Sequence, residues 1–210
     1  MLNFKHFIYD LLIAKGLSET AAEYLNMLGL LFALLLIAFI VDFITKRLLR
    51  RFSSGLAKRT KTNFDDILIT NKLPRNIAHI VPLLILIEFV PQVFFDFDYA
   101  ENIIEKTLLV IAILLTLQII RSFLSSIKDY LKTLSRYKDK PIDSYIQVFM
   151  IFAWLLGIFS IIALITGISF GAFATTLGAA SAVILLIFKD TILGFVASIQ
   201  VSINDMVRIG

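Results

Sequence analysis

The chain has 210 residues, of which 59% are hydrophobic and 17% are charged, and its formal net charge is +4. Soluble domains usually contain about half apolar and about a quarter charged residues. One soluble core of this size could not absorb the apolar surplus. The composition therefore rules out a water-soluble enzyme and predicts a membrane protein. A disulfide scaffold is also excluded, because the chain has no cysteine.

The N-terminal residues 1–24 are not expected to act as a signal peptide. Their apolar stretch is interrupted by Tyr9 and Asp10, and no small-residue cleavage site follows. Apolar residues recur here at helical spacing, namely Phe4, Phe7, Ile8, Leu11 and Leu12. This pattern predicts an amphipathic segment that lies on the outer surface of the membrane.

Five windows of the sequence are long and apolar enough to cross a membrane, which takes about 20 residues in a helix. Four of them divide residues 25–166: about 25–44, 77–95, 103–123 and 145–166. The second is the least regular, because it contains Pro82, Glu88 and Pro91. The fifth lies within residues 167–188, which carry no charge. The expected fold is an all-α membrane protein with five transmembrane helices.

The basic residues are concentrated in alternate connections between these spans. Residues 46–75 contain nine Lys and Arg, and residues 121–145 contain six, out of 20 in the chain. By the positive-inside rule, the N-terminus is expected outside and the C-terminus in the cytoplasm. The basic connections are expected to set the topology and to contact anionic lipid heads. They lack the interleaved aromatic residues of a nucleic-acid site, so no nucleic-acid partner is expected.

Few side chains could carry chemistry. His6 and His79 lie far apart, there is no cysteine, and no metal or cofactor motif occurs, so neither a metal nor a cofactor is expected. Glu88 can be an interfacial acid or part of a proton relay. Asp42, one helical turn before Lys46, is interpreted as an ion partner at a helix end. No enzyme is predicted.

The fifth span has a flank of small residues at helical spacing, formed by Gly171, Thr175, Gly178, Ala179 and Ala182. Small flanks let helix backbones approach closely in lipid. Two interpretations remain open at this point. The flank can make one tight contact inside a monomeric bundle, or it can join identical helices in a ring around an axis.

The sequence after this flank changes character at Lys189, Asp190 and Thr191, which interrupt the apolar run. The Asp190 carboxylate can cap the start of a new helix, so a sharp bend is expected there. Residues 189–203 are too short and polar to span, and they are expected to form an amphipathic helix along the inner interface. Residues 204–210 break the helical period and are predicted to begin a β domain.

Four features of residues 167–210 resemble the pore-lining helix of the small-conductance mechanosensitive channel (MscS) family. They are Leu-Gly-Ala-Ala at 177–180, Phe-Lys-Asp-Thr at 188–191, Gly194 within the amphipathic stretch, and Val-Arg-Ile-Gly at 207–210. With less specific motifs, the four preceding spans look like the family's YbdG-like branch with five transmembrane helices. The family's cytoplasmic β and α/β domains would be absent from these 210 residues.

The resemblance implies a mechanosensitive ion channel of the bacterial inner membrane. Membrane tension would open it during hypo-osmotic shock and release ions and small solutes. The four helices of residues 25–166 would form its membrane sensor region. The chains would form a ring-shaped homo-oligomer, a heptamer, with the kinked fifth helix lining the pore. Membrane lipids and copies of the same chain would be its partners.

The resemblance also assigns roles to individual residues in the segment 167–203. Alignment on residues 177–180 places Ala182 and Leu186 at the family's hydrophobic constriction. A methyl group closes a pore less well than leucine does, so Val183 and Leu185 are alternatives. Packing between pore helices would involve Gly171, Thr175, Gly178 and Ala179. The helix would break at Lys189, Asp190 and Gly194. Two other functions remain open: a secondary transporter, for which the sequence lacks the expected internal repeat, and a nonconducting membrane scaffold.

Overall fold

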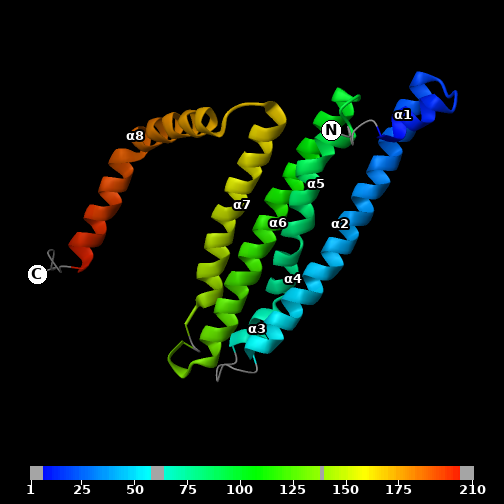
Figure 1. Cartoon of the computed structure of the whole chain (residues 1–210). Helices are drawn as coiled ribbons and strands as arrows, with labels where there is room; N and C mark the ends of the chain where they lie inside the picture. The colour runs from blue at the N-terminus through cyan, green and yellow to red at the C-terminus, as the bar shows by residue number, and fades with distance from the viewer. Residues whose placement is uncertain (1–6, 58–63, 138–139, 204–210) are drawn as a thin grey trace, which may run out of the picture. The chain divides into compact units, whose positions relative to one another are not determined.

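The computed structural model describes residues 7–57, 64–137 and 140–203, and this part of the chain is built of helices without a strand. Figure 1 shows their order along the chain. The α-helices are α1 (Phe7–Ala14), α2 (Glu19–Ala57), α3 (Phe64–Thr70), α4 (Leu73–Ala78), α5 (Ile80–Val93), α6 (Asp98–Thr133), α7 (Ile142–Thr166) and α8 (Phe170–Ile203). A short 3-10 helix, η1 (Ser135–Tyr137), follows α6.

Within the described residues, five helical stretches are long and apolar enough to cross a membrane. They are Glu19–Arg51, Leu73–Val93, Asp98–Thr133, Ile142–Thr166 and Phe170–Gly194. This confirms the prediction of an all-α chain with five such helices. Several are longer than the predicted windows, because an α-helix continues past the apolar core of the bilayer. At 1.5 Å per residue, the 36 residues of α6 extend about 54 Å, against a hydrocarbon core of about 30 Å.

The chain divides into two compact units, Met1–Ile165 and Thr166–Gly210. In the first unit, α2, α5 and α6 lie side by side (Figure 1), and α5 packs against both of the others. The short α1 packs on α2 at one end of this unit, while α3 and α4 pack against α2 and α6 at the opposite end. The buried core lies between α2, α5 and α6 and consists of Leu34, Leu83, Val90, Val93, Phe94 and Leu108.

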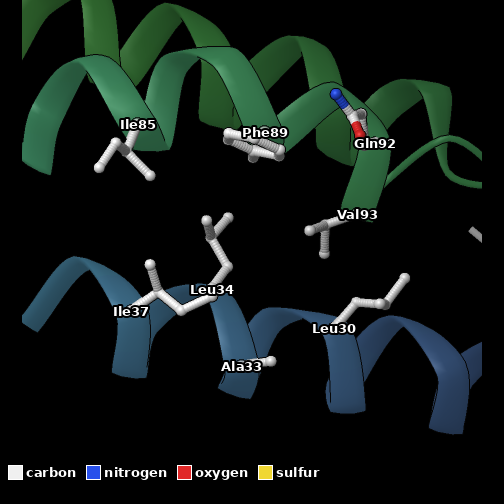
Figure 2. A pocket seen from close by; sticks show the side chains of 8 residues that line it. All are labelled: Leu30, Ala33, Leu34, Ile37, Ile85, Phe89, Gln92 and Val93. Carbon is white, nitrogen blue, oxygen red and sulfur yellow. The ribbon is translucent and has the colours of Figure 1, made fainter. Parts of the chain in front are cut away.

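A groove of about 480 Å³ remains open between α2 and α5 (Figure 2). It is lined from α2 by Leu30, Ala33, Leu34 and Ile37, and from α5 by Ile85, Phe89, Gln92 and Val93. Gln92 is the one polar side chain in that lining. Such a surface is compatible with lipid tails and offers almost nothing for hydrogen bonding.

The second predicted span is divided between α4 and α5, with His79 at the junction. Pro82 accounts for the division. Proline has no N–H to donate, and its ring clashes with the carbonyl four residues earlier, here that of Ala78. The chain therefore ends α4 at Ala78, and α5 begins at Ile80. Pro91 lies inside α5 near its end.

Polar contacts join the helices at the end of the first unit that contains α3 and α4. The Asn71 side-chain amide donates to Asp129 of α6 at 2.8 Å, and the Asn76 amide donates to the Ser122 hydroxyl at 2.7 Å. Lys128 and Lys132 of α6 form ion pairs with Asp143 at the start of α7. These contacts fix the short helices against α6 and link α6 to α7.

Candidate functional site

The helix with the most informative sequence pattern, α8, begins at a well-defined cap. The Ser169 hydroxyl accepts a hydrogen bond from the Ala172 amide at 3.2 Å, which satisfies one of the free N–H groups of the first turn. Just before it, Gly167 has φ +73°, a conformation that glycine adopts without the steric cost of a Cβ. This residue lets the chain leave α7 and start α8 within three residues.

From this cap, α8 runs without interruption from Phe170 to Ile203. The sequence predicts two pieces, 167–188 and 189–203, whereas Lys189, Asp190 and Gly194 all lie inside one helix. A capping residue needs a non-helical backbone, and Asp190 does not have one. Lysine is a good helix former and this stretch has no proline, so nothing forces the helix to end there. The ribbon of α8 still changes direction along its length (Figure 1).

The small residues of α8 form one open flank. At 3.6 residues per turn, its members lie within an arc of about 100°; they are Gly171, Thr175, Gly178, Ala179 and Ala182. All of them are exposed, and a Cβ built on Gly171 or Gly178 meets no other atom within 4 Å. The Thr175 hydroxyl donates to the Gly171 carbonyl at 2.8 Å, so its polar group is satisfied within its own helix. We call these five residues the small flank.

The candidate constriction residues extend the small flank toward the C-terminal half of α8. Leu186 lies on the same side of the helix as Ala182, and its side chain is 74% exposed. Val183 and Leu185 lie at the two borders of this side, and both are also exposed. A single chain supplies one copy of each residue, so a constriction would need further copies of the chain.

The opposite side of α8 carries large apolar side chains. By the same helical geometry they share an arc of about 100°, and they are Phe170, Phe173, Leu177, Ile184, Ile187 and Phe188. All are exposed except Phe173, which is half-buried. Small residues therefore dominate one side of α8 from Gly171 to Ala182, and large apolar residues dominate the opposite side, which also carries Ala180.

A polar site lies where α2 meets the junction of α4 and α5. The Lys46 ammonium is 2.5 Å from Oδ2 of Asp42, which confirms the predicted ion pair. The expected helix end is wrong, because α2 continues past both residues to Ala57. His79 Nδ1 lies 3.0 Å from the other carboxylate oxygen. Sequence reasoning missed His79, because its approach to Asp42 depends on how two spans pack. The break that Pro82 imposes beside His79 was the available signal.

Glu88 is the remaining ionisable candidate from the sequence. Glu88 lies on α5, is exposed, and forms no ion pair within the part of the chain that the structure describes. In the ranges 7–57, 64–137 and 140–203, no three His, Asp or Glu side chains are grouped so that they could hold a metal ion. The predicted start of a β domain at 204–210 lies outside the described residues.

No protein-family model matches this chain, and no solved structure matches it significantly.

Proposed function

We propose that this chain is a subunit of a mechanosensitive ion channel of the small-conductance type, in which membrane tension opens a pore lined by α8. The observation that carries the proposal is the separation of α8 into a small flank and a bulky face, both exposed in the single chain. A helix in a symmetric ring needs such a division. Small residues let neighbouring copies approach, while large apolar residues face lipid or other helices.

The proposed gate is a ring of Leu186 side chains, with Ala182 one turn away and Val183 or Leu185 as alternatives if the helix is rotated. A narrow apolar ring loses its water, and ions cannot cross the dry gap. Tension favours the conformation with the larger in-plane area, so it shifts a two-state equilibrium toward the open pore. This mechanism needs no ligand and no catalytic group.

The cellular setting is part of the same proposal. The chain resides in the bacterial inner membrane with its N-terminus outside and its C-terminus in the cytoplasm, as the basic connections favour. It assembles as a homo-oligomer, a heptamer by resemblance, and contacts membrane lipids. The pore releases ions and small solutes during hypo-osmotic shock.

Patch recording under suction tests the gate. Leu186→Ser places a hydroxyl in the proposed ring, so we expect opening at lower tension or a leak at rest. Ile184→Ser is the matched control, because it makes a similar change two residues away on the bulky face. Equal thresholds and equal leak in Leu186→Ser and wild type would show that Leu186 is not the seal.

Counting subunits by native mass spectrometry separates the proposal from its alternatives. A ring of seven chains with tension-dependent conductance supports the channel. A monomer with saturable solute uptake would instead indicate a secondary transporter. A ring that gives no electrical signal under any tension would indicate a nonconducting scaffold.

A further inference from the structure

Four cationic side chains surround a cavity of about 190 Å³ where α2, α3 and α4 meet. Lys46 and Arg50 line it from successive turns of α2, Lys72 and Arg75 line it from the start of α4, and Ile69 and Pro74 complete the wall. We call this the basic cavity. Its volume is about that of six liquid waters, at about 30 Å³ each, which is enough for one phosphate group.

Side chains that do not line the basic cavity hold the backbone around it in place. Lys72 has φ +60°, a left-handed conformation uncommon outside glycine, in the turn that joins α3 to α4. The Asn71 amide donates to Asp129 and the Asn76 amide to Ser122, so both flanks of Lys72–Arg75 are tied to α6. The cations on α4 are therefore positioned by contacts in which they take no part.

The positive charge in the basic cavity is poorly compensated. Asp42 pairs with Lys46, whereas Arg50, Lys72 and Arg75 form no ion pair with any carboxylate whose side chain the structure describes. Asp66 of α3 is exposed and does not line the cavity. Like charges held close together repel, so an anion that enters the cavity stabilises this arrangement.

The cavity also lies at the ends of two apolar spans. The first candidate span ends at Arg51 and the second begins at Leu73, so the four cations flank the hydrocarbon core at the level where lipid headgroups lie. Two guanidinium groups can each bind two phosphate oxygens. We infer that the basic cavity binds the phosphate of an anionic phospholipid headgroup, a role that does not depend on the proposed channel.

Native mass spectrometry of the full chain, titrated with phosphatidylglycerol or with phosphatidylcholine, tests this inference without measuring conductance. We expect one tightly bound phosphatidylglycerol per subunit and weaker binding of phosphatidylcholine. Arg50→Gln and Arg75→Gln should each weaken phosphatidylglycerol binding about fivefold, and the double variant about 25-fold. Arg75→Lys keeps the charge but loses the two-point contact of the guanidinium, so it should weaken binding less than Arg75→Gln does.

The matched control is Arg47→Gln, which removes the same charge from the same helix. Arg47 is exposed, lies over the Phe43 ring at 5.9 Å, and does not line the cavity. Its variant should change binding less than twofold. Equal losses in Arg47→Gln and Arg50→Gln, or equal binding of the two lipids, would overturn the inference. If inorganic phosphate binds wild type and not the double variant, while phosphatidylglycerol binds both equally, the lipid assignment is wrong and the occupant is a soluble phosphate.

Discussion

The contact between Tyr9 and Asn26 shows how one buried polar side chain can hold a short helix in place. Tyr9 lies in the first turn of α1, where backbone N–H groups have no partner within the helix. Its amide donates to the Asn26 side-chain carbonyl at 3.3 Å, and Asn26 is only 1% exposed. Ile8 packs close to Gly29, one turn further along α2. Asn26 therefore satisfies one of the amides in the first turn of α1.

Replacement of Asn26 by alanine should loosen α1 from α2. The change removes a buried acceptor from the Tyr9 amide, which costs about 1–3 kcal/mol. We expect a lower unfolding midpoint in detergent and faster proteolysis between α1 and α2. Asn102→Ala, at an exposed site on α6, is the control and should stay within about 0.5 kcal/mol of wild type. Similar losses in both variants would contradict the role given to Asn26.

The Tyr9 side chain gives the stability of the folded chain a dependence on pH. Partial burial, and then the nearby carboxylates of Glu19, Glu23, Asp96 and Asp10, raise the pKa of Tyr9 above its ordinary value. The folded state thus favours the neutral phenol. This stabilisation is complete below the ordinary tyrosine pKa and is lost as pH rises through the raised pKa. Unfolding midpoints measured against pH should therefore fall more steeply for wild type than for Tyr9→Phe, and parallel curves would contradict this.

At the scale of elements, the sequence predicts what depends on local periodicity and composition. Five apolar windows identify the five helices that could span a membrane, and Pro82 marks the span that divides into α4 and α5. The i,i+4 spacing of Asp42 and Lys46 predicts their ion pair. Contacts between distant segments have no such signal. Neither the approach of His79 to Asp42 nor the basic cavity follows from any spacing, because both depend on how the helices pack.

The continuity of α8 illustrates a different limit of sequence reasoning. Lys189 and Asp190 interrupt the apolar pattern, yet neither interrupts the helix. A change in polarity reports where a helix meets a new solvent, whereas its end requires a change in backbone conformation. Proline or a glycine with positive φ makes such a change easy, and Gly167 does so at the other end of α8. Gly194, in contrast, lies inside the helix.

The small flank of α8 yields a prediction about assembly. Gly178→Leu adds bulk where the single chain has no neighbouring atom within 4 Å, so the fold of one subunit should tolerate it. If α8 helices pack through this flank, the added side chain separates them and the oligomer dissociates more easily. Ala180→Leu is the control, because it adds bulk on the opposite side of the same helix. Light scattering on the purified complexes would detect the difference, and equal oligomer mass in both variants would refute packing through the flank.

Over the whole chain, far more apolar surface is exposed than a water-soluble protein exposes. Between 0% and 22% of each span's most apolar window is buried within the chain, and α8 has the lowest value. The remaining surface must contact lipid tails or other copies of the chain. Helices of the first unit still share a core through α2, α5 and α6. For α8, the missing contacts have to come from lipid or from other protein chains.

The distribution of charge predicts which ends of these helices face the cytoplasm, and the cysteine-free chain makes this simple to measure. Tyr99 is 83% exposed near the start of α6, beside the acidic connection. Ser135 is exposed in η1, within a basic connection. The positive-inside rule places Tyr99 outside and Ser135 inside. A membrane-impermeant maleimide should therefore label Tyr99→Cys but not Ser135→Cys in intact spheroplasts, and the reverse in inverted vesicles. Labelling of Ser135→Cys from outside would invert the topology and move the basic cavity to the outer leaflet.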